Sequence, residues 1–112
     1  MQLDVSGQNI EITDSLHEYV REKVDRVKRH MDHVTVAHVV LSVEKFRNSA
    51  EITLTASGAT LHADAEDKDM YAAIDAMADK IDRQARRYQG KVKDHHQREA
   101  RDAKEQPPEP TE

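Results

Sequence analysis

Apolar residues recur at steps of three or four in two separate segments, the spacing that places side chains on one face of an α-helix. The first series is Leu16, Val20, Val24, Val27 and Met31. The second series is Met70, Ile74, Met77, Ile81, Ala85 and Tyr88. These patterns predict one helix from about Thr13 to Met31 and a second from Asp69 to at least Tyr88.

The residues that flank both series fit helix ends. Residues 13–15 supply capping oxygens before the first series, and Ser15 with Glu18 has the spacing of a capping box. Asp69 suits the N-cap of the second helix, and Gly90 is a possible stop or weak point.

Between the two helices the apolar period changes to two, which is typical of strands with one buried face. Three such runs cover about 36–43, 50–56 and 61–66, and short turns join them, so we expect an antiparallel meander. Leu3 and Val5 alternate in the same way and indicate a short first strand.

The predicted order is β-α-β-β-β-α, which belongs to the α+β fold class and gives a four-stranded sheet. Because the sheet has one apolar face and each helix one apolar stripe, we expect both helices packed on one face of the sheet. The other face is left to solvent. Residues 1–95 should form this single domain, and the proline- and glutamate-rich tail 96–112 should be disordered without a partner.

Composition narrows the function classes. A chain of 112 residues supports one domain with a modest core, and the absence of cysteine excludes disulfides, thiolate nucleophiles and cysteine-containing zinc sites. Since there is no G-x-S-x-G motif and no glycine-rich phosphate loop, we expect neither an enzyme nor a small-molecule substrate. The chain has no signal peptide and no apolar run of about 18 residues, which favours a cytoplasmic protein with no membrane partner.

The net charge of −5 hides an uneven distribution of charge. Residues 59–79 hold six acids and one lysine, whereas residues 80–98 hold seven lysines and arginines and two acids. At 100° per residue, one flank of the second helix about 80° wide carries four cations. They are Lys80, Arg83, Arg87 and Lys91.

On the first helix, Lys23 and Arg26 lie next to the apolar stripe, so two helices side by side would present a broad basic surface. Such a surface can bind nucleic acid, because each cation that meets a phosphate releases condensed counterions. The alternative is that these charges only keep exposed helix faces soluble.

Aromatic residues and histidines add little to this picture. With 4% aromatic residues and no tryptophan, recognition of structured RNA by shape and phosphates is favoured over base stacking. We expect Phe46 to cap the core, with stacking as the alternative, and His38 and His62 to lie on the open sheet face. No pair of neighbouring histidines has the spacing of an established metal site, and no calcium-loop pattern surrounds the acids of 64–69, so no metal and no cofactor is expected.

Four stretches stand out as motifs: DMYAAID at 69–75, DKIDRQ at 79–84, NIEIT at 9–13 and VVLSVEK at 39–45. They resemble the ribosome hibernation promoting factor and ribosome-associated translation inhibitor family, and the likeness runs from Met1 to about Lys93. The resemblance implies a fold similar to double-stranded RNA-binding domains. It also implies a site on the small ribosomal subunit, between head and body, where messenger RNA and the A- and P-site transfer RNAs bind.

The same resemblance implies that basic residues of both helices contact 16S ribosomal RNA, and that ribosomal proteins near this site are partners as well. Lys28 and Arg86 lie in the same basic segments and join the set. The candidate RNA-binding residues are Lys23, Arg26, Lys28, Lys80, Arg83, Arg86, Arg87, Lys91 and Lys93.

The function that the resemblance implies is ribosome hibernation in stationary phase or stress, by a protein that is monomeric when free. Lacking a second, dimer-forming domain, the chain looks like the short family form that helps ribosomes pair. Its acidic tail instead resembles that of a sister inhibitor that opposes pairing. A further alternative is a protein-interaction module that acts on a transcription factor through the open sheet.

Overall fold

The structure is a computed structural model that describes residues 1–56 and 58–94, with side chains as far as Tyr88. Its elements are β1 (Gln2–Gln8), α1 (Asp14–Lys28), β2 (Val34–Glu44), β3 (Arg47–Ala56), β4 (Ala59–Asp67) and α2 (Met70–Asp94). This is the predicted order β-α-β-β-β-α. The predicted tail 96–112, and residue 95 at the end of the predicted domain, lie outside the described residues.

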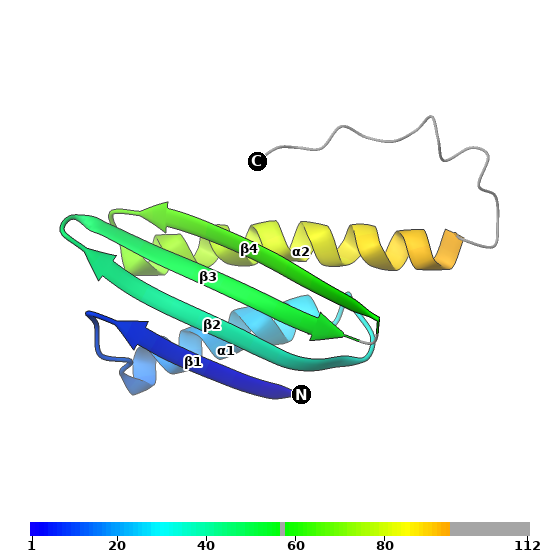
Figure 1. Cartoon of the computed structure of the whole chain (residues 1–112), viewed down its shortest axis with the longest axis horizontal. Helices are drawn as coiled ribbons and strands as arrows, with labels where there is room; N and C mark the ends of the chain where they lie inside the picture. Colours follow the sequence, from blue (N-terminus) through cyan, green and yellow to red (C-terminus); the bar gives the residue numbers. More distant parts are fainter. Residues whose placement is uncertain (57, 95–112) are drawn as a thin grey trace.

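The strands form one sheet in the order β1-β2-β3-β4. The neighbours among β2, β3 and β4 pair antiparallel, which confirms the meander. In contrast, β1 pairs with β2 in parallel, because α1 carries the chain back along the sheet before β2 begins. Both helices cover the same face of the sheet, as expected, and leave the other face open (Figure 1).

The core lies between the sheet and the two helices. Alternate residues of β2 and β3 point inward, among them Leu41, Ile52 and Leu54, each at most 1% exposed. From α2, Ile74 and Met77 are completely buried against them. The apolar periods that predicted the strands and helices are therefore the periods of burial, and the polar residues between them remain on the outside.

The first helix starts near the expected place, and its cap is one of the residues 13–15 that were predicted to supply capping oxygens. Thr13 is the N-cap, since its hydroxyl accepts a hydrogen bond from the main-chain amide of Leu16 at 3.2 Å. Ser15 therefore lies inside α1, and the predicted Ser15–Glu18 capping box is wrong. Although α1 ends at Lys28, Met31 is still buried, because a turn after the helix brings it back onto the core.

The second helix is longer than its apolar series required. It begins directly after Asp69, as expected, and continues through Gly90 to Asp94. Of the two possibilities at Gly90, the stop is therefore excluded, and the weak point stays a prediction. A glycine costs a helix interior about 1 kcal/mol, which the surrounding helical residues outweigh. Within residues 1–56 and 58–94, no helix combines the length and apolarity that crossing a membrane requires.

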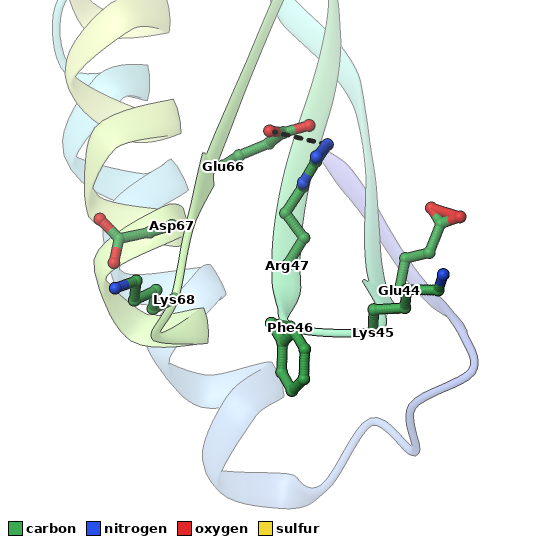
Figure 2. A pocket seen from close by; sticks show the side chains of 7 residues that line it. All are labelled: Glu44, Lys45, Phe46, Arg47, Glu66, Asp67 and Lys68. Atoms are coloured by element: carbon green, nitrogen blue, oxygen red, sulfur yellow. Dashed lines mark ion pairs between the residues drawn. The ribbon is translucent and has the colours of Figure 1, made fainter.

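The expectation that Phe46 caps the core is also wrong. Phe46 is 88% exposed in the two-residue turn between β2 and β3, and its ring points away from the sheet (Figure 2). Lys45 before it has a φ of 55°, so the strand alternation does not continue through the turn. The ring lines a surface pocket shared with the connection from β4 to α2, where Lys68 lies.

Candidate nucleic-acid interface

The two helices that carry the predicted contact residues lie side by side and run in the same direction (Figure 1). Tyr19 and Lys23 of α1 contact Asp75 near the start of α2. Just beyond the end of α1, His30 lies 3.9 Å from Asp82 of α2. We call these five residues the interhelical seam. The candidate residues lie at this seam, on the outer face of α2, on the opposite flank of α2 and in the last turns of both helices.

Lys23 is held at the seam by two groups. Its Nζ lies 3.0 Å from Oδ1 of Asp75, the same oxygen that accepts a 2.6 Å hydrogen bond from the Tyr19 hydroxyl. The ammonium also lies 5.2 Å from the centroid of the Tyr19 ring, against which the Tyr71 ring packs edge-on. Since its side chain is 21% exposed, Lys23 offers little accessible charge to a ligand while these contacts persist.

The hydrogen bond between Tyr19 and Asp75 shifts the pKa of both groups. It lowers the pKa of Asp75; burial opposes this shift, and the charges of Lys23 and Arg26 add to it. The same bond raises the pKa of Tyr19, as do burial and the charge of Asp75. Asp75 therefore stays ionised at neutral pH and neutralises part of the charge of Lys23. Arg26 lies close enough to act on the same carboxylate.

The opposite flank of α2 faces the edge strand β4. Lys80 Nζ donates a hydrogen bond to the main-chain carbonyl of Asp64 at 2.9 Å, and Gln84 Nε2 donates to that of His62 at 2.8 Å. Carbonyls on the outer edge of a sheet have no strand partner, so these two side chains cover the edge. Because a carbonyl carries no net charge, Lys80 keeps its positive charge beside β4.

Arg86 lies on the seam side of α2. Its Nη2 is 3.2 Å from Oδ2 of Asp82, while 61% of the arginine side chain remains exposed. The other oxygen of Asp82 is buried and has no hydrogen-bond partner among the described residues. The guanidinium of Arg86 is therefore partly neutralised but still accessible.

The remaining arginines lie on the outside of the helix layer. With Lys80 facing β4 and Arg86 facing α1, helical geometry places Arg83 and Arg87 between them, on the outer face of α2. Both side chains are exposed, as is that of Arg26. We call the group Arg26, Arg83, Arg86 and Arg87 the arginine surface. The predicted stripe thus extends from the outer face of α2 toward β4 and not toward α1.

The arginine surface does not include three further predicted contact residues. Lys28 is exposed in the last turn of α1. Lys91 and Lys93 belong to the last turns of α2, and their side chains lie outside the described ones.

Sequence reasoning missed the residues that hold the cations in place. Tyr19 and Lys23 are four apart on α1, which is a visible signal of neighbouring side chains. Their partner Asp75 is 56 residues from Tyr19, and no spacing rule connects the two. Gln84 was missed for the same reason, since its partner is on β4.

Residues 3–93 match the protein family described as sigma 54 modulation protein / S30EA ribosomal protein. The chain belongs to this family. Among S30EA relatives, a ribosome hibernation promoting factor of Azotobacter vinelandii is 50% identical over 84 residues, which cover 75% of this chain and 78% of that protein. The factor of the same name from Escherichia coli strain K12 is 42% identical over 95 residues, covering 85% of this chain and 100% of that protein.

A solved structure of a ribosomal subunit interface protein from Coxiella burnetii has the same fold, with a TM-score of 0.76 and 26% identity. The match covers 80% of this chain and 99% of that one. The predicted family resemblance and fold class are therefore confirmed, and the homologues of this S30EA family member are ribosome hibernation promoting factors and ribosomal interface proteins.

Proposed function

We propose that the protein is a ribosome hibernation factor that binds 16S ribosomal RNA of the small subunit through the arginine surface. The observation that carries this proposal is the exposure of Arg83, Arg86 and Arg87 on one helix of a chain whose net charge is −5. Phosphate binding requires cations that are gathered on one accessible face, and this face can be basic although the whole protein is acidic. Support also comes from relatives that are named ribosome hibernation promoting factors.

The open face of the sheet has the opposite charge. Its strand positions alternate with the buried ones, and they hold five acids. These are Asp4, Glu44, Glu51, Asp64 and Glu66. A polyanionic RNA attracts the helix layer and repels the sheet, so the protein should approach the ribosome with α2 in front.

The proposed site is the decoding region between the head and body of the subunit. A domain bound there occupies the path of messenger RNA and of the A- and P-site transfer RNAs, so initiation stops and idle ribosomes are preserved. Steric occlusion makes and breaks no covalent bond, and the protein acts as a non-enzymatic, cytoplasmic factor that is monomeric when free. Lys28, Lys80, Lys91 and Lys93 would extend the contact along both helices.

We expect bound ribosomes to pair, as the resemblance to the short family form implies. The alternative is a sister-type inhibitor that keeps ribosomes single, and residues 96–112 are where the two types are expected to differ. Sucrose gradients of stationary-phase ribosomes, with the full chain or with 96–112 deleted, distinguish them. Paired ribosomes with the full chain support the first type, whereas pairing after truncation alone identifies the second.

The central experiment is cosedimentation of Arg83→Glu with Arg87→Glu and small subunits. We expect binding to be lost, because both substitutions reverse charge on the outer face of α2. The matched control is Arg21→Glu with Arg47→Glu, which makes the same change in net charge on exposed side chains away from α2. Undiminished binding by a folded Arg83/Arg87 variant, or equal loss in the control, would contradict the proposal.

A further inference from the structure

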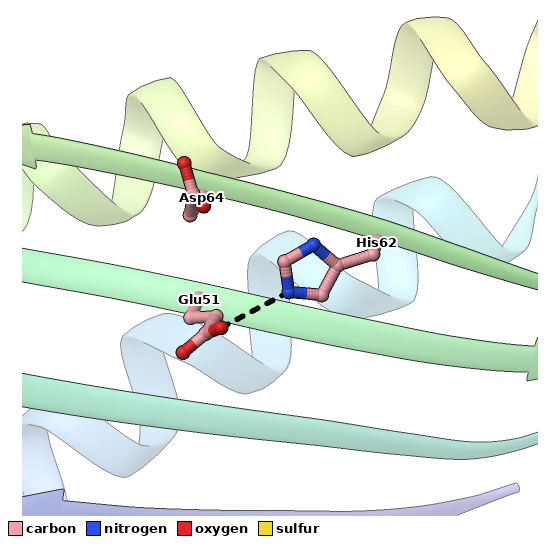
Figure 3. A group of neighbouring side chains, drawn as sticks. All are labelled: Glu51, His62 and Asp64. Carbon is pink, nitrogen blue, oxygen red and sulfur yellow. Dashed lines mark hydrogen bonds and ion pairs between the residues drawn. The ribbon is translucent and has the colours of Figure 1, made fainter.

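A second cluster of chemically active side chains lies on the open face of the sheet, away from the arginine surface. Glu51 of β3 is directly opposite Asp64 of β4, and His62 precedes Asp64 by two residues, so all three side chains share this face (Figure 3). One ligand atom from each lies within 4.8 Å of the other two. His62 Nε2 already lies 3.0 Å from Oε2 of Glu51.

We propose that Glu51, His62 and Asp64 form a binding site for a divalent transition-metal ion of the Zn²⁺ type. An imidazole nitrogen and two carboxylate oxygens are ligands that zinc accepts, with a water molecule in the fourth position. Ligand atoms about 2.0–2.2 Å from a tetrahedral zinc lie about 3.3–3.6 Å from one another. Side-chain rotation can bring exposed groups from 4.8 Å to that separation without moving the strands.

The charges at the cluster favour a cation. Two carboxylates directly opposite each other on antiparallel strands repel, and a bound divalent ion neutralises both. Two of the three ligands, Glu51 and Asp64, line a hollow in the sheet surface that Lys80 also lines. Its ammonium, however, is hydrogen-bonded to the main-chain carbonyl of Asp64 and not to a carboxylate. Glu66 lies on the same face, but its carboxylate is 3.7 Å from Nη1 of Arg47. The two carboxylates of Glu51 and Asp64 therefore carry the negative charge of the site.

The ligand set also selects among cations. Mg²⁺ and Ca²⁺ prefer shells made of oxygen alone, and Ca²⁺ takes six to eight of them. A set with one imidazole and two carboxylates suits Zn²⁺, Co²⁺ and similar ions better. Mg²⁺ should therefore be a poor competitor at this site.

The test is calorimetric titration of the free, full-length protein with ZnCl₂ in the presence of excess Mg²⁺, on the wild type and on His62→Gln. We expect the wild type to bind one Zn²⁺ more than this variant. His38→Gln is the matched control, since His38 is exposed on the same sheet face and lies 3.4 Å from the single carboxylate of Asp4. It should titrate like the wild type, which would show that the lost Zn²⁺ depends on His62 and not on any histidine of this sheet face.

The isosteric variants Glu51→Gln and Asp64→Asn complete the ligand test, and each should weaken the extra site by about tenfold or more. The His62 ring resonances in NMR spectra should shift on Zn²⁺ addition in the wild type and move less in these two variants. If His62→Gln titrates like the wild type, or if neither carboxylate variant changes the affinity, the cluster is a cross-strand ion pair and the metal site is refuted. Binding to ribosomes plays no part in this readout, so it stands apart from the proposed function.

Discussion

The outer face of α2 and the open face of the sheet carry charges of opposite sign, and each collects them through a different repeat. On α2, residues four apart share a face, so Arg83 and Arg87 lie together on the outer face, with Arg86 next to them on the side toward α1. On the sheet, every second residue of neighbouring strands shares a face, so acids from β3 and β4, such as Glu51 and Asp64, meet across strands. Net charge therefore says little about the partner of this protein, whereas the distribution between the two faces says much.

The largest expected effect concerns the core that joins the two layers. Ile52 is completely buried between the sheet and the helices, so Ile52→Ala should lower the free energy of unfolding by about 2–5 kcal/mol. Urea denaturation followed by circular dichroism measures this change. Phe46→Ala is the control, because Phe46 is 88% exposed and its truncation should cost within about 0.5 kcal/mol. Equal losses in the two variants would show that Phe46 packs onto the core after all.

The second effect compares one substitution on each charged face by its influence on the salt dependence of ribosome binding. Arg83→Gln should weaken binding to small subunits and reduce the slope of log K against log salt by about one, because one phosphate contact is removed. Glu44→Gln on the open sheet face should leave that slope unchanged. Binding assays over a range of KCl concentrations give both slopes. Equal slopes for all three proteins would remove Arg83 from the interface.

A smaller effect is expected where the helix layer meets the sheet edge. Lys80→Met keeps the aliphatic part of the side chain but loses the hydrogen bond to the Asp64 carbonyl, so it should destabilise the fold by about 1 kcal/mol. Gln84→Met should act similarly through the carbonyl of His62. Thermal unfolding checks both. If Lys80→Met weakens ribosome binding with no change in stability, its role is in the interface and not at the edge.

The smallest effect is a pH dependence at the seam. The lowered pKa of Asp75 contributes stability above the unfolded value of 3.8, and this is lost as pH falls through the folded pKa. The raised pKa of Tyr19 contributes stability below 10.0, and this is lost as pH rises through the folded pKa. The difference in melting temperature between wild type and Tyr19→Phe should therefore be largest near neutral pH and shrink at both extremes. A difference that is constant with pH would contradict this coupling.

Periodicity was sufficient for the architecture. The steps of three and four predicted both helices, and the alternation of 36–43, 50–56 and 61–66 predicted the meander, because those repeats are set by burial. The failures lie at points where the repeat stops. Lys45, a turn residue with a φ of 55°, breaks the alternation just before Phe46, and at Gly90 the helix continues despite a residue of low propensity.

The details of the sites depend on contacts between elements, which no local repeat encodes. The flank of α2 that carries Lys80 could be placed on a helical wheel, but whether it faces α1 or β4 follows from how the helix packs on the sheet. In the same way, Glu51 meets Asp64 only through the register of two strands. Spacing along the chain suggested no metal site there, since the ligands come from separate strands.

The cover that Lys80 and Gln84 provide at β4 also limits how copies of this chain can associate. A sheet with two unprotected edge strands can add strands at both edges and grow into fibrils. In this sheet the β4 edge is covered, so β1 is the edge at which another strand can be added. If β1 of one molecule pairs with β1 of a second, both free edges are used and no further copy can be added. Such growth terminates at two copies, so this sheet cannot extend into a fibril by adding strands at its edges.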